Sequence, residues 1–272
     1  MQKTIIQIYE VQKPGEAEAL IELGVDHIGS VLADPAKWKS ASIRKTVQTV
    51  KRRGAKSVLI PLMKDPAAIF AALDYYEPDC VHLCDVLSPY PDEQQTVVRD
   101  FDALLSLHID IRDRFPRLDI MRSLSVPRAG LPDASVIEKN ILDFAARFAP
   151  VTDFFLIDTL LSDADQPVAG FVGITGKPCD WTIAKAVIEQ SPISVILAGG
   201  LAADNVYDAV VGLRPAGVDS CTRTNAADRS GRPVRFKKDL KKVRGFIEEV
   251  RRADRFLEGE SRDAKLIHRE RI

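Results

Sequence analysis

Glycine and hydroxyl residues follow three short apolar runs in the later part of the chain, and this arrangement suits phosphate binding. The apolar runs occupy residues 153–158, 194–198 and 217–220. The residues of interest after them are Gly176, Gly199, Gly200, Thr222 and Arg223. Backbone N–H groups left open beside glycine attract anions, as do helix N-termini. The spacing predicts a phosphate site, against the simpler alternative that Gly199 and Gly200 only permit a tight turn.

Strands followed by helices must position these loops. A chain of 272 residues, 46% of them hydrophobic, suits one (β/α)8 barrel better than two small domains. In such barrels the loops after the seventh and eighth strands commonly bind phosphate. The glycine clusters fall in the matching part of this chain.

Eight strand and helix pairs can be assigned along the sequence. The predicted strands occupy residues 4–9, 26–32, 57–62, 79–84, 119–124, 153–158, 195–197 and 218–220. The predicted helices occupy residues 14–23, 42–53, 66–75, 92–115, 135–148, 181–190, 204–213 and 237–252. The loop over residues 159–180 is long enough to cover an active site. We therefore predict a single-domain (β/α)8 TIM barrel over residues 1–254, followed by a loosely held, charged C-terminal tail over residues 255–272.

Composition argues against several other classes of protein. The net charge is −1, and acidic residues interrupt the basic residues between positions 235 and 255, so no nucleic-acid partner is expected. No apolar run approaches the roughly 20 residues that span a bilayer, so no membrane partner is expected. The N-terminus enters a strand pattern without a signal sequence, and the four cysteines form no paired framework. These features predict a cytoplasmic protein with reduced thiols.

Several motifs resemble the phosphoribosylanthranilate isomerase family, in their order and in their spacing. They cover most of residues 4–250 and are weakest between about residues 88 and 148. The most specific combination is a Gly-Ile-Thr-Gly-Lys loop over residues 173–177 with Asp180 and Trp181, followed by Leu-Ala-Gly-Gly-Leu over residues 197–201. An N-terminal stretch over residues 8–29 is similar to the opening of the same family.

The resemblance implies a TIM barrel of tryptophan biosynthesis that acts without a metal or another cofactor. The implied reaction is an Amadori rearrangement, which converts a phosphoribosylated anthranilate to its 1-deoxyribulose form. This chemistry needs an acid that protonates the furanose ring oxygen and a base that removes the C2 proton. The resemblance places the acid at Asp158, at the end of the sixth predicted strand; a helix cap or loop carboxylate is the alternative.

The position of the base departs from the family motif. The family has Lys-Ile-Cys-Gly at the end of its first strand, and this chain has Gln7-Ile8-Tyr9-Glu10, so that Tyr9 replaces the catalytic cysteine. A tyrosine with an ordinary pKa near 10 is a poor base at neutral pH. Strand alternation predicts that the adjacent Glu10 points to the other face.

Cys84 is a second candidate for the base. It follows His82 by two residues, so both side chains are expected on one face of the strand, where an imidazole could activate a thiol. The alternative is a buried cysteine beside a hydrogen-bonded histidine. A zinc site that also used Cys80 is disfavoured, because alternate residues of one strand rarely complete a tetrahedron.

The substrate-binding motifs also differ from the family. The family has Ser-Pro-Arg after its second strand, and the implied role of that Arg is to pair with the anthranilate carboxylate. This chain has Asp34-Pro35-Ala36-Lys37, so Lys37 or Lys39 would replace the Arg as a point charge. The family's Ser-Ser-Gly after the eighth strand becomes Cys221, Thr222 and Arg223, which adds a strong phosphate donor.

Three functions are consistent with these residues. The first is an intramolecular isomerase of the phosphoribosylanthranilate type, with a phosphorylated small-molecule substrate and a homodimer as one assembly option. The second is a diverged barrel that binds a phosphorylated metabolite without isomerase activity. The third is a phosphosugar lyase or epimerase, because a fold does not fix a reaction.

Overall fold

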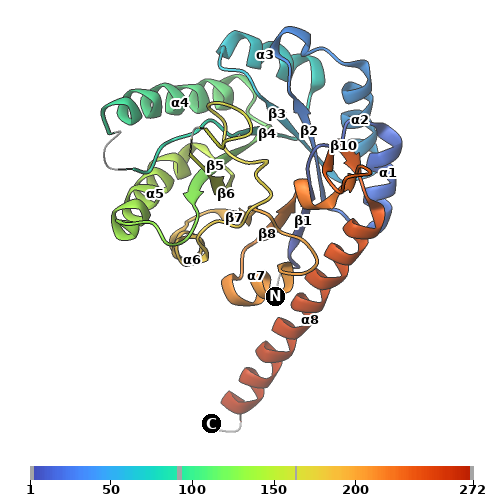
Figure 1. Ribbon diagram of the computed structural model, residues 1–272, viewed down its shortest axis with the longest axis vertical. Helices are drawn as coiled ribbons and strands as arrows, with labels where there is room; N and C mark the ends of the chain where they lie inside the picture. The colour runs from blue at the N-terminus through green and yellow to red at the C-terminus, as the bar shows by residue number, and fades with distance from the viewer. Residues whose placement is uncertain (1–2, 91–93, 163, 270–272) are drawn as a thin grey trace.

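The computed structural model describes residues 3–90, 94–162 and 164–269. Eight parallel strands form a closed barrel, in which each strand pairs with the next and β8 pairs with β1 (Figure 1). The strands are β1 (Ile5–Ile8), β2 (His27–Leu32), β3 (Lys56–Pro61), β4 (Cys80–Leu83), β5 (Asp119–Pro127), β6 (Phe154–Leu160), β7 (Ser194–Leu197) and β8 (Gly217–Ser220). The predicted (β/α)8 fold is confirmed.

In the part of the chain that the structure describes, eight α-helices lie around the barrel (Figure 1). They are α1 (Pro14–Leu23), α2 (Ala41–Arg52), α3 (Pro66–Tyr76), α4 (Gln94–Arg114), α5 (Ala134–Phe148), α6 (Trp181–Gln190), α7 (Val206–Leu213) and α8 (Leu240–Arg269). Local signals set several of their ends. Asp180 caps α6 by accepting hydrogen bonds from the backbone N–H groups of Thr182 and Ile183, and Gly24 ends α1 in the left-handed conformation.

The end of the chain differs from the prediction in two respects. A two-stranded antiparallel hairpin, β9 (Asn225–Ala227) and β10 (Pro233–Lys238), precedes α8 and was not predicted. The closing helix begins at Leu240 rather than at residue 237, and it continues unbroken to Arg269. The helix therefore crosses the predicted boundary at residue 254, and the division into barrel and tail stays a prediction.

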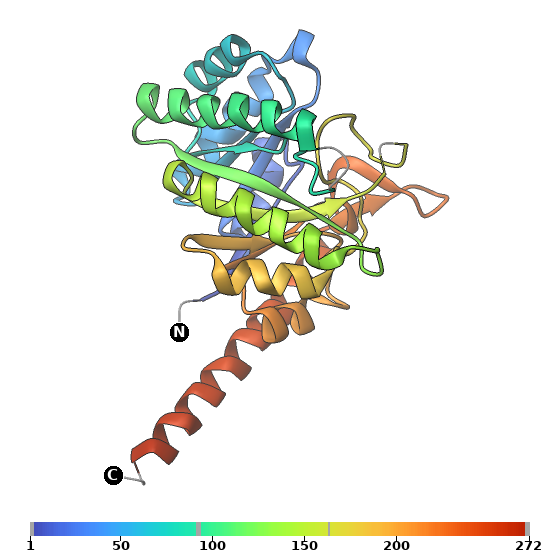
Figure 2. The same cartoon turned by 90° about the vertical axis from the view of Figure 1, so that its left-hand side faces the viewer.

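The first half of α8 packs through a regular apolar stripe. Its buried side chains recur every three or four residues, which is the spacing of one helix face. They are Val243, Phe246, Ile247, Val250, Ala253 and Leu257. Figure 2 shows α8 projecting beyond the barrel, on the side away from the β9–β10 hairpin and the β6–α6 loop.

The inside of the barrel is more polar than the layer between strands and helices. The outer layer consists of aliphatic and aromatic residues such as Ile6, Leu20 and Phe155. Inward-facing side chains include the buried polar residues Gln7, His27, His82, Ser123 and Asp219. Polar groups buried in this number need hydrogen-bond partners, and they mark the interior as a place for chemistry as well as packing.

No helix in the described ranges is long and apolar enough to cross a membrane. The four cysteines are free thiols. Cys80, Cys84 and Cys179 are buried, whereas Cys221 is half-buried.

Candidate active site

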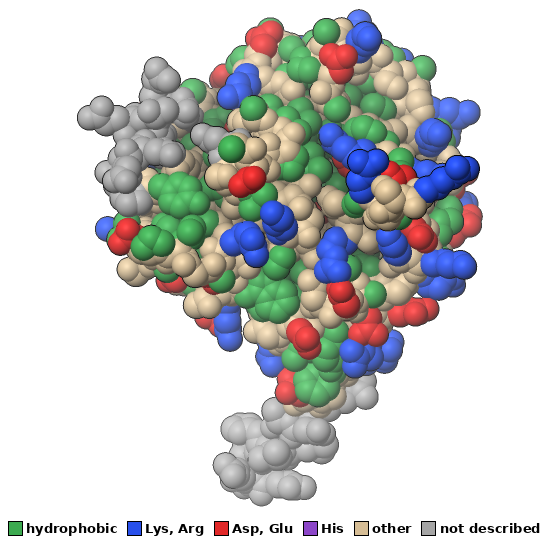
Figure 3. All heavy atoms as spheres, in the orientation of Figure 1, with side chains coloured by type: hydrophobic (Ala, Val, Ile, Leu, Met, Phe, Trp, Pro, Cys, Tyr) green, Lys and Arg blue, Asp and Glu red, His purple; other side chains and the backbone are tan. Residues whose placement is uncertain are grey.

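Two segments cover the carboxyl ends of the barrel strands, where TIM barrels place their active sites. One is the long loop between β6 and α6, and the other is the β9–β10 hairpin; Figure 2 shows both on the same side of the barrel. Figure 3 shows several Lys and Arg side chains on this face of the molecule. Covered strand ends with basic surroundings suit an anionic substrate.

A narrow cavity lies beneath these two segments. It has a volume of about 40 Å³ and is lined by residues of the strand ends and the β6–α6 loop, including Tyr9, Glu10, His82, Cys84, Asp158, Phe171 and Asp219. Ligand pockets usually measure roughly 300–1,000 Å³. This cavity alone is therefore smaller than a typical ligand pocket.

Asp158 lies on β6 in the wall of this cavity, as the sequence predicted for the acid. Its carboxylate accepts a hydrogen bond from the backbone N–H of Thr159 at 2.7 Å. Burial raises the pKa of Asp158 to about 7, although the bond from Thr159 favours the charged form. Gly173 closes over the carboxyl: a Cβ on Gly173 would lie 2.4 Å from Oδ2. Asp158 is therefore poised to give up a proton near neutral pH.

The predicted phosphate residues converge on an adjoining cavity. It is lined by Gly176, Gly199, Gly200, Thr222 and Arg223, and it shares Asp158 and Asp219 with the first cavity. Gly199 and Gly200 have φ angles of +85° and +61°, which favour glycine. A Cβ on Gly200 would lie 2.7 Å from the carbonyl oxygen of Gly176. The two loops therefore lie directly against each other at Gly200, and the assignment of phosphate to this cavity stays a prediction.

Arg223 is partly engaged by the protein. Its guanidinium donates to the carbonyl of Gly200 at 3.1 Å and forms an ion pair with Asp204 at 2.6 Å. A phosphate would share Arg223 with these partners. Lys37, the other predicted ligand, is exposed in a short 3-10 helix (Pro35–Lys37), and it lines neither of the two cavities.

Tyr9 points into the barrel. Its hydroxyl lies 2.7 Å from Nδ1 of His82 and 3.6 Å from the sulfur of Met121, and its side chain is buried. The ring occupies space that Gly29 leaves open, since a Cβ on Gly29 would lie 1.8 Å from Cδ1 of Tyr9. Burial and then the nearby Asp219 raise the pKa of Tyr9 well above its ordinary value. This environment argues against the predicted use of Tyr9 as a base.

Cys84 does not have the histidine partner that the sequence suggested. Nε2 of His82 lies 2.7 Å from Oγ of Ser123, and Nδ1 faces Tyr9, so both ring nitrogens have other partners. Burial and then Arg122 lower the pKa of His82 to about 3. Burial and then Asp85 raise the pKa of the Cys84 thiol. A neutral thiol beside a neutral imidazole fits the buried alternative better than an activated base.

Glu10 lies where strand alternation did not place it. The expectation that it faces away from the site is wrong, because β1 ends at Ile8 and Glu10 adopts a left-handed φ of +64°. Its side chain is buried and lines the same cavity as Asp158. Its carboxylate accepts hydrogen bonds from Arg235 at 2.5 Å and from Asn225 at 3.1 Å.

Asp219 is a second acidic residue that sequence reasoning missed. It lies on β8, is buried, and lines both cavities. One of its carboxylate oxygens has no hydrogen-bond partner. Burial and then the charge of Asp158 raise the pKa of Asp219 well above its ordinary value. A charged residue within the otherwise apolar run at 217–220 was the signal available in the sequence.

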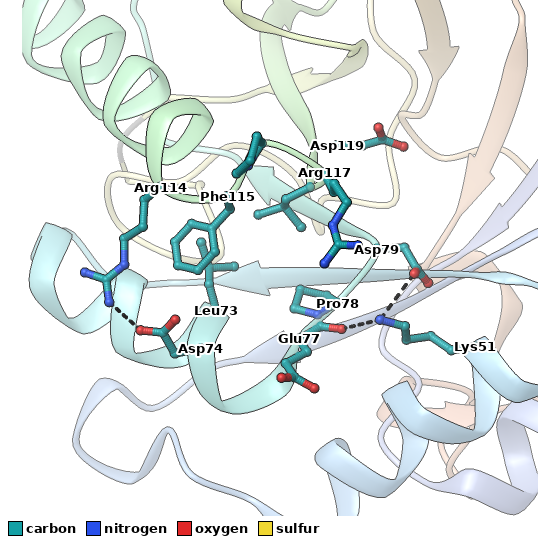
Figure 4. Close-up of a pocket in the computed structure, with 12 residues that line it drawn as sticks. Lys51, Leu73, Asp74, Glu77, Pro78, Asp79, Arg114, Phe115, Arg117 and Asp119 are labelled. Carbon is teal, nitrogen blue, oxygen red and sulfur yellow. Dashed lines mark hydrogen bonds and ion pairs between the residues drawn. The ribbon is translucent and has the colours of Figure 1, made fainter.

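A larger cavity lies at the opposite end of the barrel, at the amino ends of β4 and β5 (Figure 4). It measures about 730 Å³ and is lined by Lys51, Asp74, Asp79, Arg114 and other residues. Two ion pairs lie within it: Arg114 with Asp74 at 2.5 Å, and Lys51 with Asp79 at 3.5 Å. In TIM barrels this end serves stability, so its size does not make it the site. Within the described ranges, no group of three or more His, Cys, Asp and Glu residues could hold a metal ion.

Comparisons with known proteins find similarity to one family of enzymes. The family model of N-(5'-phosphoribosyl)anthranilate (PRA) isomerase matches residues 119–249. N-(5'-phosphoribosyl)anthranilate isomerase 1 of Methanosarcina mazei is 28% identical over 261 residues, which cover 94% of this chain and 98% of that one. The isomerase of Methanosarcina acetivorans is 26% identical, over 94% of this chain and 96% of its own.

A solved structure extends the comparison to the fold. The phosphoribosylanthranilate isomerase of Pyrococcus furiosus superposes with a TM-score of 0.64 at 18% identity, covering 92% of this chain and 99% of that one. Monomers of the dimeric Thermotoga maritima enzyme give a TM-score of 0.62 at 17% identity, over 91% and 98% of the two chains. The family model, the near full-length relatives and the shared barrel all show that this chain is similar to phosphoribosylanthranilate isomerases.

Proposed function

We propose that this chain catalyses the Amadori rearrangement of phosphoribosylanthranilate to its 1-deoxyribulose form, a step of tryptophan biosynthesis. The observation that carries the proposal is the environment of Asp158. Its carboxyl, with a pKa of about 7, lies between the glycine-rich cavity and an apolar cavity wall. A general acid works best when its pKa lies near the operating pH. The names of the curated relatives support the same reaction.

The two adjoining cavities divide the substrate into two parts. The cavity around Gly199 and Gly200 would take the phosphate, because its backbone approaches closely without side chains. The apolar wall, which includes Val31, Ile60, Leu62 and Phe171, would take the aromatic ring of the amine. Asp158 lines both cavities, where the ribose would lie. This order matches a substrate with a phosphate at one end and an aromatic amine at the other.

The direct test is a fluorescence assay with freshly prepared phosphoribosylanthranilate. Asp158→Asn should lower kcat by about 10²- to 10⁴-fold, because the amide cannot donate a proton as the acid does. Asp143→Asn is the matched control, since it makes the same change at an exposed position of α5. Wild-type protein without turnover would overturn the proposal. A binding barrel without activity, or a phosphosugar lyase or epimerase, would then become the better interpretation.

We also propose that the protein is cytoplasmic and that it forms a homodimer. The reaction itself requires neither property. Free thiols suit a reducing compartment, which supports the location. The dimeric Thermotoga maritima relative supports the assembly. Light scattering after size-exclusion chromatography tests the second point: a monomer at micromolar concentration would contradict it.

A further inference from the structure

We propose that Glu10 is the base that removes the C2 proton of the substrate. This inference rests on the proposed function and assigns the group that the family motif leaves open. Glu10 extends from the end of β1 and Asp158 from β6, and both line one cavity. In the closed barrel, β8 and β7 lie between these two strands. The two carboxyl groups therefore approach the cavity from separate sides, as an acid and a base acting on one sugar require.

The charge states of the groups around the cavity separate their roles. Burial raises the pKa values of Tyr9, Cys84 and Cys221, so these groups hold their protons at neutral pH. Burial also raises the pKa of Asp158 and of Asp219. Glu10, in contrast, forms an ion pair with Arg235 at 2.5 Å. Among these cavity groups, Glu10 is the one whose side chain has a cationic partner.

The backbone turns Glu10 toward the cavity at an energetic cost. Its φ of +64° is a left-handed conformation, which costs a non-glycine residue on the order of 1 kcal/mol or more. The residues after it are tied to β2: the N–H of Val11 donates to Gly29 at 3.0 Å, and Oγ of Ser30 donates to the Val11 carbonyl at 2.7 Å. These bonds hold the turn that directs the carboxylate inward. Strain that the fold maintains in this way is a recurring feature of functional sites.

The hairpin holds the carboxylate in place. Asn225, at the start of β9, donates to Glu10, and Nζ of Lys238, at the end of β10, donates to the side chain of Asn225 at 2.5 Å. Lys238 also donates to the carbonyl of Cys221 at 2.9 Å. A carboxylate offers about four acceptor sites, and each Glu10 oxygen accepts one bond in these two contacts. An accepting lone pair remains for a substrate proton, on a group oriented by its neighbours.

The proposed step balances in protons and electrons. Asp158 gives its proton to the furanose ring oxygen, the bond from C1 to that oxygen breaks with its electron pair left on oxygen, and the amine lone pair forms C1=N. Glu10 takes the C2 proton, the C–H electrons form C1=C2, and the C=N π electrons return to nitrogen. The resulting enol loses its O–H proton and C1 gains one. Two protons are available at this point, the one on Glu10 and the one from the enol. One goes to C1 and the other to the Asp158 carboxylate, so Glu10 is again deprotonated and Asp158 is again protonated.

The test compares three substitutions of Glu10 in the full chain with phosphoribosylanthranilate as substrate. Glu10→Gln should lower kcat by about 10²- to 10⁴-fold with little change in KM, because it removes the proton acceptor and keeps the bond from Asn225. Glu10→Asp should retain part of the activity. Glu10→Ala should recover activity when sodium formate is added, and the recovery should saturate. A purely structural role for Glu10 would not produce rescue by a free carboxylate.

The controls separate failure of this inference from failure of the proposed function. Arg235 is partly exposed, so water can solvate it in Glu10→Gln, and an unchanged melting temperature within a few degrees would show that the variant folds. If Glu10→Gln fails to fold, the dependence of kcat on pH in Glu10→Asp becomes the test. The ascending limb of this pH profile should shift relative to wild type, because a different carboxylate then accepts the proton. Turnover by wild-type protein that survives in Glu10→Gln at more than a tenth of its rate would overturn the role of Glu10 alone. Absence of wild-type turnover would overturn both proposals.

Discussion

The two sides of the barrel mouth are built in different ways. On the β6–β8 side, glycines with positive φ bring backbone groups together, as at Gly199 and Gly200. On the β1 side, the site is made of side chains. Tyr9 fills the interior of the barrel, and Glu10 lines the cavity while its carboxylate pairs with Arg235. A site made of backbone depends on a few glycines in fixed order, whereas a site made of side chains can exchange one group for another. This difference fits the sequence, in which the glycine-bearing loops over residues 173–177 and 197–201 resemble the family while the position of the base does not.

The largest effect is expected at the backbone-built side, from Gly200→Ala. The new Cβ would lie 2.7 Å from the carbonyl oxygen of Gly176, at a φ of +61°. Left-handed strain and a clash with backbone together should cost roughly 2–4 kcal/mol of the free energy of unfolding. They should also abolish the rise in melting temperature produced by inorganic phosphate.

Gly54→Ala is the matched control for this prediction. Gly54 also has a positive φ, of +78°, but a Cβ there would meet nothing within 4 Å. It should cost about 1 kcal/mol and leave the phosphate effect intact. Thermal unfolding with and without phosphate measures both variants. Equal behaviour of the two would contradict a phosphate site that depends on close backbone approach.

On the β1 side of the barrel mouth, Gly29→Ala should destabilise the fold, because the new Cβ would clash with one side chain. Its Cβ would lie 1.8 Å from Cδ1 of Tyr9, so the tyrosine ring would have to move. We expect a loss of about 1–3 kcal/mol in the free energy of unfolding. In a Tyr9→Ala background the same change should cost much less, because the clashing ring is gone. Urea unfolding of the two single variants and the double variant measures this coupling, and strict additivity would show that the ring does not determine the cost.

Much of the barrel could be predicted from local signals. The bounds of α1 agree with the prediction, residues 14–23, because Pro14 favours the first turn and Gly24 supplies the left-handed end. The β9–β10 hairpin was missed because β9 is only three residues long and β10 is largely exposed, so neither gives the signal of a half-buried strand. The extension of α8 was missed because the prediction required an apolar face along the whole helix.

The part of the site that is made of backbone groups could be predicted from the sequence. The part that is made of side chains was harder to predict. Gly176, Gly199, Gly200 and Thr222 line one cavity as expected, because each follows a strand end of the parallel barrel. Glu10 could not be placed, because the alternation rule holds only while the strand continues and β1 ends two residues before it. The partners of His82 are Tyr9 and Ser123, which come from other strands, and one sequence does not specify such contacts.

A second test of the acid measures stability instead of rate. Burial raises the pKa of Asp158 to about 7 in the folded protein, above its ordinary value near 4. The folded state thus holds this proton more tightly, and that contribution to stability is complete below about pH 4 and is lost as the pH rises through 7. Asp158→Asn cannot ionise. Its stability relative to wild type should rise between pH 4 and pH 8, by about 1.4 kcal/mol for each unit by which the folded-state pKa of Asp158 exceeds its ordinary value. Melting temperatures across this range that change in parallel would contradict the buried carboxyl.

The smallest effect is expected from Lys37→Ala. This variant tests whether the β1 side of the barrel mouth, where the site is made of side chains, recognises the anthranilate carboxylate. Lys37 is exposed, and a single exposed charge pair is worth about 0.2–1 kcal/mol, so KM should rise by less than about fivefold. Salt should remove the difference, because exposed charges are screened. Lys45→Ala is the control, because it removes the same charge from an exposed position of α2 and is expected to leave KM unchanged. Equal KM values for wild type and Lys37→Ala at low salt would mean that apolar contacts alone hold the amine, and that this side of the mouth has replaced carboxylate recognition as well as the base.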